Sequence, residues 1–186
     1  MFKLIVFSIG ILFLASCKAP EPRRPVTHSS GSFINKSAER NKEIYNQEEM
    51  LFKQLMKSDS LQTYFASQKG FWYYYNKKDS LNNNRPKVGD TIVFTYDVKH
   101  LNGKVILSEE EVGEQHYIVD KTNQELISGI RDGIKLMKEG EIVTFLLPSY
   151  KAYGYYGIEN KLGTNIPVQS TVTLKSISKT QENKQL

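Results

Sequence analysis

Residues 125–154 read ELISGIRDGIKLMKEGEIVTFLLPSYKAYG, and this stretch contains three predicted elements in succession. Apolar side chains recur at helical spacing from Ser128 to Met137, which predicts a short amphipathic helix that Gly140 terminates. Residues 142–147 are apolar on both faces, as expected for a central strand. A loop rich in tyrosine follows the strand. The order indicates a sheet packed on one short helix.

Segments on both sides of this stretch carry further strand patterns. Aromatic residues at 71–75 favour a strand, and apolar side chains alternate along residues 91–100. Asn102-Gly103 predicts a hairpin turn, because both positions tolerate a positive φ. The remaining predicted strands are 104–107, 117–119 and 171–178. The predicted class is α+β, with an antiparallel sheet of about five strands wrapped on one short helix and preceded by an N-terminal helical segment.

The helical segment precedes the sheet, at residues 35–69. Ile44, Leu51 and Leu55 recur at helical spacing, and Ser58 or Asp59 is a suitable cap for a second short helix. Two interpretations stay open for the apolar face. It packs on the domain that follows, or it forms a homodimer or partner interface.

The N-terminus has the pattern of an export signal. Lys3 is followed by the apolar run Leu4–Leu14, which is too short to span a bilayer core of ~30 Å. Small residues then precede Cys17, as in bacterial lipoprotein signals, in which lipid is attached to the cysteine. A plain secretory signal with an incidental cysteine is the alternative. Lys18 is a weak indication of an outer-membrane location.

The composition of the next segment, rich in Pro, Ser and Arg, is typical of a flexible tether. The predicted boundaries are therefore a signal peptide at 1–16, a lipid-anchored tether at 17–34, the helical segment at 35–69, the sheet domain at 70–180 and a polar tail at 181–186.

Several classes of site are excluded by composition. A single cysteine excludes an intramolecular disulfide, and the three histidines are scattered without metal-ligand spacing, so we expect no metal or cofactor. Gly129 and Gly133 are isolated in the helical pattern, which indicates close packing and not a phosphate loop. The net charge of +5 comes from dispersed Lys and Arg residues without a nucleic-acid motif, so we expect no nucleic-acid partner.

Over residues 70–179, a set of short motifs resembles the FK506-binding-protein (FKBP) family of peptidyl-prolyl isomerases in order and spacing. The motifs are Val88-Gly89-Asp90-Thr91, Tyr96, Asn102-Gly103-Lys104, Glu125-Leu126-Ile127, Gly129, Gly133, Met137, Gly140-Glu141, Pro148, Ala152-Tyr153-Gly154 and Ile166-Pro167. Together with the lipoprotein signal and the aromatic strand at 71–73, they resemble the gliding-motility-associated isomerase lipoproteins of Bacteroidetes-type bacteria.

This resemblance implies a reaction that needs neither cofactor nor covalent chemistry. Rotation about a peptide bond has a barrier of ~18–20 kcal/mol, and a site that binds the twisted amide better than the planar forms lowers it. The resemblance implies that the Tyr153 hydroxyl and the Ile127 N–H are the donors, with Tyr96 beside them. The implied substrate-binding residues are Tyr96, Ile106, Leu107, Leu126, Ile127, Ile130, Tyr153, Ile166 and Leu174. Ordinary core packing is the alternative for Tyr96, Ile130 and Leu174, and loop anchoring for Tyr153.

The chain also departs from the family pattern. Ile106-Leu107 stands where the family usually has phenylalanine and aspartate, and aliphatic Ile130 and Leu174 replace aromatic residues. Gln115 falls near the position of another pocket aromatic. Loss of the carboxylate at Leu107 is expected to lower turnover by one or two powers of ten, or ~1.4–2.8 kcal/mol.

A longer loop, residues 154–165, contains Tyr155, Tyr156 and Ile158. Exposed aromatic residues near a groove often contact protein partners. A small cluster that packs beneath the loop is the alternative interpretation.

Two functional hypotheses follow. In the first, the protein is a lipid-anchored isomerase that acts on prolyl segments of exported envelope or motility proteins, at the periplasmic face of the outer membrane. In the second, it is a chaperone or scaffold that holds such segments with little turnover. Ile106-Leu107 favours the second hypothesis, and Tyr153 with Ile127 favours the first. The sequence leaves the client, the oligomeric state and FK506 binding open.

Overall fold

The computed structural model describes residues 31–79, 83–121 and 126–179. The chain divides into two compact units, Met1–Ser37 and Ala38–Leu186. The predicted signal peptide, Cys17 and most of the tether lie outside the described residues. Within the described ranges, no helix combines the length and the apolar character that crossing a membrane requires.

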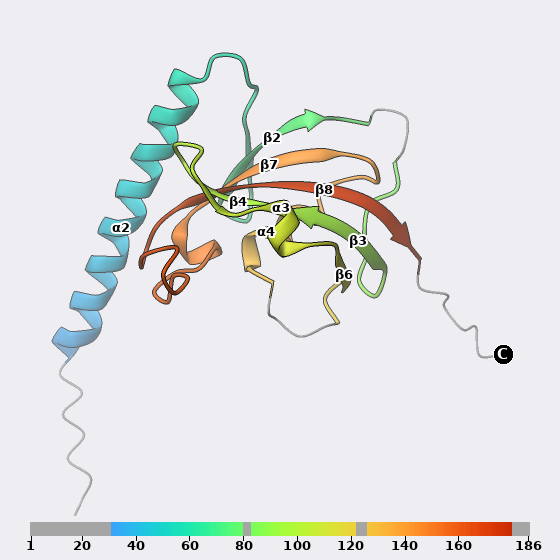
Figure 1. The fold of residues 1–186 in the computed structure, drawn as a ribbon. Helices are drawn as coiled ribbons and strands as arrows, with labels where there is room; N and C mark the ends of the chain where they lie inside the picture. Colours follow the sequence, from blue (N-terminus) through green and yellow to red (C-terminus); the bar gives the residue numbers. More distant parts are fainter. Residues whose placement is uncertain (1–30, 80–82, 122–125, 180–186) are drawn as a thin grey trace, which may run out of the picture. The chain divides into compact units, whose positions relative to one another are not determined.

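The described elements are one long N-terminal helix followed by a sheet whose strands are interrupted by short helices (Figure 1). In chain order they are α2 (Gly31–Ser58), β1 (Phe65–Ser67), β2 (Phe71–Lys77), β3 (Thr91–Tyr96), β4 (Val98–His100), β5 (Val105–Leu107), α3 (Glu109–Val112), β6 (Gln115–Ile118), α4 (Ser128–Ile134), β7 (Ile142–Leu147), the 3-10 turn η2 (Ser149–Lys151) and β8 (Val168–Ser178). The α+β class predicted from the sequence is confirmed.

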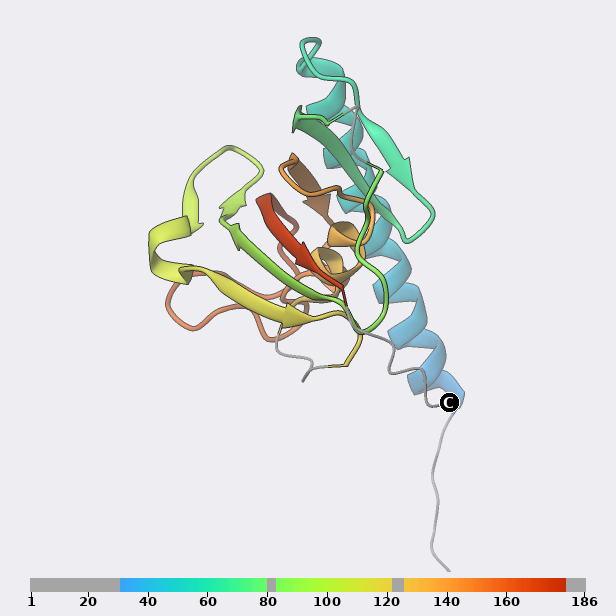
Figure 2. The same ribbon diagram turned by 90° about the vertical axis from the view of Figure 1, so that its right-hand side faces the viewer.

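The strands form one antiparallel sheet of eight in the order β1-β2-β7-β8-β3-β6, with β4 paired to β8 and β5 (Figure 2). The predicted central strand is confirmed, because β7 pairs on both sides and five of its six residues are buried. The sheet has more strands than the five or so expected. Asp97 divides the predicted strand 91–100 in two, and a further strand forms at Phe65–Ser67.

The additional strand β1 occupies the place of the predicted second helix. Helix α2 ends at Ser58, and the Asp59 carboxylate then accepts hydrogen bonds from the Leu61 N–H and the Tyr64 hydroxyl, which close a turn. Phe65 pairs with Tyr73 of β2, and their rings stack with centroids 5.5 Å apart. The prediction of a second helix is wrong because cross-strand aromatic contacts outweigh weak helical propensity over so short a segment.

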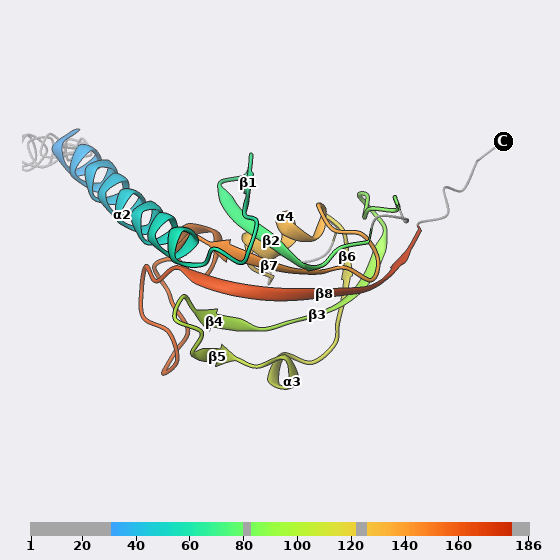
Figure 3. The same cartoon turned by 90° about the horizontal axis from the view of Figure 1, so that it is seen from above.

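Helix α4 lies against β7 and β8 on one face of the sheet (Figure 3). A Cβ atom at Gly129 would lie 2.5 Å from the Leu147 side chain, and one at Gly133 would lie 2.7 Å from the Phe145 ring. The predicted close-packing role of both glycines is therefore confirmed. The helix ends at Ile134, earlier than the predicted Met137, and Gly140 (φ +82°) forms the turn that leads into β7.

Within the second unit, α2 packs on the sheet domain. Phe52 is fully buried, and its ring centroid lies 5.2 Å from that of Trp72. Glu48 accepts a hydrogen bond from the Ser149 N–H. Of the two interpretations of the apolar helix face, these contacts support packing on the domain, while Met50 and Leu51 of the same helix remain exposed.

Candidate functional site

Two partly buried phenols, Tyr96 and Tyr153, belong to the candidate site. Tyr96 is the last residue of β3, and Tyr153 lies in the loop after η2. Burial raises the pKa of both hydroxyls, and the neighbouring Tyr96 raises the pKa of Tyr153 further. Both side chains are partly buried against the same hydrophobic cluster. Both hydroxyls stay protonated at neutral pH and are therefore available as hydrogen-bond donors.

Backbone hydrogen bonds within the loop stabilise the conformation around Tyr153. The Gly154 N–H donates to the Ser149 carbonyl at 2.8 Å, and the Gly157 N–H donates to the Tyr153 carbonyl at 3.1 Å. Farther along, the Asn165 N–H donates to the Gly154 carbonyl at 2.7 Å. Gly154 has a φ of +52°, which is accessible to glycine without strain. These bonds fix the direction in which the Tyr153 side chain leaves the loop.

Ile127 stands at the start of α4, as its N-cap residue. Its carbonyl accepts the Arg131 N–H, while its own N–H has no acceptor among the residues that the structure describes. The first N–H groups of a helix have no intrahelical acceptor, so they are free to bind a ligand carbonyl. The side chains of Leu126 and Ile127 are half-buried against the core. This placement agrees with a donor role for the main chain at Ile127.

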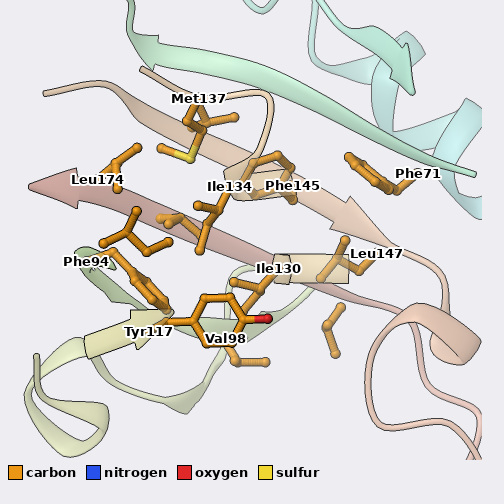
Figure 4. Packing of buried hydrophobic residues seen from close by; sticks show 14 of the residues in the cluster. Phe71, Phe94, Val98, Tyr117, Ile130, Ile134, Met137, Phe145, Leu147 and Leu174 are labelled. Atoms are coloured by element: carbon orange, nitrogen blue, oxygen red, sulfur yellow. The ribbon is translucent and has the colours of Figure 1, made fainter. Parts of the chain in front are cut away.

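The base of the site is aliphatic and closed to solvent. Ile130, one turn into α4, is fully buried and lies near Val98 and Tyr117 (Figure 4). Ile106 of β5 is also buried, and Leu107 is half-buried against the same cluster. Tyr96, Leu107, Leu126, Ile127 and Tyr153 are partly buried and pack against the hydrophobic cluster that contains Ile106 and Ile130.

Two of the predicted substrate-binding residues lie elsewhere. Leu174 is fully buried on β8, its backbone pairs with Gly140 and Glu141, and in Figure 4 it lies apart from Ile130, on the side of Met137. Ile166 is partly exposed and lines a separate hollow of about 290 Å³ together with Leu51 of α2. Their roles in substrate binding stay predictions.

Tyr117 is a residue that the sequence analysis treated only as part of a strand. Its side chain is 7% exposed and lies beside Ile130, and within the described residues its hydroxyl has no hydrogen-bond partner (Figure 4). An unpaired buried hydroxyl is unusual, because it loses its hydrogen bonds to water without replacement. The alternation of the strand could have placed Tyr117 inward, but only the packing shows the unpaired hydroxyl.

The chemistry available at this site is limited. No carboxylate stands at position 107, and among the described residues no group of three or more His, Cys, Asp or Glu side chains could hold a metal ion. What the site offers is an apolar base, two neutral phenols and a free main-chain N–H. Such an arrangement suits an apolar ring flanked by carbonyl groups.

The longer loop, residues 154–165, has a buried part and an exposed part. Ile158 is half-buried against the core and bridges to buried Leu162, which agrees with the predicted cluster beneath the loop. Tyr155 and Tyr156 are 69% and 92% exposed, with their rings in edge contact at 6.0 Å. These two side chains are thus available for contacts with other molecules.

Comparison with known proteins gives a consistent assignment. Residues 82–175, half of the chain, match the family described as FKBP-type peptidyl-prolyl cis-trans isomerase. No match was found among curated protein sequences.

Two similar solved structures cover most of the chain. One is a peptidyl-prolyl cis-trans isomerase from Pseudomonas syringae pv. tomato, at 17% identity and a TM-score of 0.56, covering 74% of this chain and 96% of that one. The other is FkpA from Escherichia coli, at 18% identity and a TM-score of 0.57, covering 96% of this chain and 82% of that one. At such identities the likeness shows the fold.

Proposed function

The chain belongs to the FKBP-type peptidyl-prolyl cis-trans isomerase family, and we propose that it isomerises prolyl bonds of exported proteins while anchored to a membrane by lipid. The observation that carries the catalytic part is that Tyr96, Tyr153 and Ile127 are all partly buried against one hydrophobic cluster, which includes Ile130.

The mechanism follows from the physical requirements of amide rotation. An uncatalysed prolyl bond exchanges over tens to hundreds of seconds. In the proposed complex the proline ring packs over the aliphatic base, and the Tyr153 hydroxyl and Ile127 N–H hold the flanking carbonyls. The twisted amide is less zwitterionic than the planar one, so a dry apolar environment favours it. Each tenfold acceleration requires about 1.4 kcal/mol of such preference.

A second candidate function is peptide holding with little turnover. It is favoured by two observations, the absence of a carboxylate at Leu107 and the complete burial of Ile130, which leaves that side chain no surface for contact with a ligand. We place the enzyme first because the residues with the proposed donors, Tyr153 and Ile127, both pack against the cluster that contains Ile130, which supports this proposal.

The membrane anchor and the location rest on the N-terminal sequence. Lipid attachment at Cys17, after the apolar run and small residues, would hold the domain on a tether at the periplasmic face of the outer membrane. The resemblance to gliding-motility-associated lipoproteins makes envelope or motility proteins the proposed clients. Metabolic labelling with an alkyne fatty acid, compared with Cys17→Ser, tests the anchor. Equal labelling of both proteins would contradict it.

A homodimer through α2 is proposed from the exposed apolar side chains Met50 and Leu51. Sedimentation velocity of the chain that begins at Lys18, with Leu51→Glu alongside, measures the association. A monomer at all concentrations would exclude it.

The activity is tested by a prolyl-tetrapeptide isomerisation assay on the same soluble chain. Tyr153→Phe removes one donor and is expected to reduce kcat/KM about tenfold, the effect of losing about 1.4 kcal/mol of hydrogen bonding to the transition state. Tyr156→Phe is the matched control, because Tyr156 is 92% exposed and outside the site. If the wild-type chain is no faster than buffer, the enzyme hypothesis is lost. Refolding of a proline-limited protein then tests the holding function.

A further inference from the structure

A second concave site lies on the other side of the tyrosine loop. It is a hollow of about 420 Å³ within the second unit, between helix α2 and the segment that follows β7. The side chains that matter for its chemistry are Tyr45 and Glu48 of α2, and Tyr150 and Tyr155 of the following segment. Gly154, the neighbour of Tyr153, also lines it. The hollow and the prolyl site therefore share the backbone of one loop.

Glu48 is the unusual group of this hollow. Its side chain is 4% exposed, and Oε2 accepts the Ser149 N–H at 3.0 Å. Oε1 is shielded from solvent and has no hydrogen-bond partner among the described residues. Burial raises the pKa of this carboxyl group, although the hydrogen bonds from Ser149 oppose the effect. A buried carboxylate oxygen without a partner is strongly unfavourable, so the group is ready to accept a donor.

No basic side chain of the described residues is paired with Glu48. The nearest lysine in sequence to its partner Ser149 is Lys151, whose ammonium group is paired with Asp132 at 2.9 Å. Glu48 lines the hollow, and the carboxylate torsion of a glutamate has broad energy wells, so a small rotation that only tilts the Ser149 bond can present Oε1 to a ligand there. The hollow thus contains an acceptor whose donor must come from another molecule.

The walls are aromatic. The rings of Tyr45 and Tyr150 lie 6.2 Å apart with planes inclined by 44°, and the Tyr150 hydroxyl donates to the Gly70 carbonyl at 3.1 Å, which holds that ring in place. Tyr155 adds a largely exposed third ring at the rim. Aromatic faces attract organic cations, and lysine and arginine stems pack well on apolar walls. An acid enclosed by three phenol rings has the chemistry of a site for an alkylammonium or guanidinium group.

We propose that this hollow binds a lysine or arginine side chain of the same client polypeptide whose prolyl bond occupies the neighbouring site. The proposal rests on the proposed function for the existence of such a client, and it adds a charge requirement. Gly154 and Tyr155 directly follow Tyr153, so one short segment of the protein contributes to both sites and one extended peptide can reach both. The protein then selects prolyl segments with a basic residue at one spacing.

The test uses pairs of fluorescent peptides with one proline and one variable residue, lysine or norleucine, placed one to six positions from the proline on either side. Norleucine keeps the apolar stem and removes the charge. At low salt one spacing is expected to bind about tenfold tighter with lysine, the gain typical of a partly desolvated cation on aromatic rings and a carboxylate. The gain should shrink in high salt. Equal binding of both peptides at every spacing would overturn the proposal.

Matched variants test whether the preference for lysine over norleucine depends on the residues that line the hollow. Glu48→Gln keeps the acceptor for the Ser149 N–H and is expected to abolish the lysine preference without changing binding of the norleucine peptide. Tyr155→Ala should reduce the preference, whereas Tyr156→Ala should leave it unchanged, because Tyr156 does not line the hollow. Both tyrosines are exposed, so neither change threatens the fold. A preference that survives Glu48→Gln would place the cation elsewhere and overturn the assignment.

A second measurement separates this proposal from the proposed function. Nα-acetyl-lysine methylamide lacks proline and probes the hollow alone, with the norleucine analogue as its control. Titration is expected to shift the backbone amide resonance of Ser149 in wild-type protein and not in Glu48→Gln. This result stands even if no prolyl peptide is turned over. If the lysine compound causes no shift beyond that of its analogue, the hollow holds only water and the proposal fails.

Discussion

The two sides of the tyrosine loop bury opposite kinds of polar group. On one side, Tyr96 and Tyr153 stand over an aliphatic base. On the other, Glu48 lies beneath Tyr45 and Tyr150. Burial raises the pKa on both sides, but the consequences differ. A phenol with a raised pKa remains a neutral donor, which suits a neutral amide. A carboxyl group with a raised pKa is protonated more readily, and a bound cation would favour its ionised form.

This contrast shows how one loop can serve two recognition tasks. Residues 149–155 contribute Tyr153 to the first site and Tyr150 and Tyr155 to the second. The supporting elements are different, since α4 underlies the prolyl site and α2 closes the hollow. A substitution that destabilises α2 should therefore impair cation binding without impairing prolyl turnover, and one that displaces α4 should do the opposite.

Phe52→Ala is the largest expected perturbation, and it removes the support of the hollow. Phe52 is fully buried against Trp72, and such a truncation typically costs about 3–5 kcal/mol. Urea denaturation and hydrogen exchange of the α2 amides measure the loss. Turnover of a neutral prolyl peptide should persist while lysine preference disappears. Met50→Ala, on the exposed side of the same helix, is the control. Loss of both activities together would show that the two sites are coupled.

Gly133→Ala is expected to impair the prolyl site and to leave the hollow intact. The new Cβ atom would lie 2.7 Å from the Phe145 ring, and overpacking of this kind costs about 1–3 kcal/mol. The shift of α4 should lower kcat/KM and spare binding of the lysine probe in the hollow. Gly163→Ala is the matched control, because its Cβ atom would have only an ordinary contact at 3.7 Å. Equal stability of the two variants would contradict the close-packing argument.

Leu107→Asp sharpens the comparison by adding a carboxylate to the prolyl site. If the missing carboxylate limits turnover, kcat/KM should rise about tenfold, equivalent to about 1.4 kcal/mol. Leu107→Asn has a similar shape without the charge and should not reproduce the gain. A fall in kcat/KM with Asp would instead indicate that an apolar side chain at position 107 is essential.

The smallest expected effect is the pH dependence of stability that Glu48 contributes. Its pKa is raised in the folded protein above the ordinary value of 4.5, so the folded state binds the proton more tightly than the unfolded state. Stability from this group is therefore present below pH 4.5 and declines as the pH rises through the raised folded value. The difference in unfolding free energy between wild type and Glu48→Gln, measured from pH 4 upward, should follow this decline. A difference that grows in favour of the wild type with rising pH would refute it.

Several predictions that depend only on residues close together in the chain are confirmed by the structure. The hairpin at Asn102-Gly103 is confirmed by its φ of +87° at Gly103 and the pairing of β4 with β5. The buried strand 142–147 and the tight packing at Gly129 and Gly133 are confirmed as well. Backbone propensity and apolar periodicity act over a few residues, so they can be read without knowing the partner surfaces.

Features that depend on contacts between distant parts of the chain were decided by the tertiary structure alone. A strand replaced the second helix because Phe65 found Tyr73 across the sheet, and Glu48 became a buried acid because Ser149, 101 residues later, lies against α2. Tyr96 and Tyr153 likewise pack on one hydrophobic cluster although they come from the end of β3 and from a distant loop. Burial, pairing and pKa depend on which surfaces meet, and those contacts span too much of the chain for any local pattern to encode.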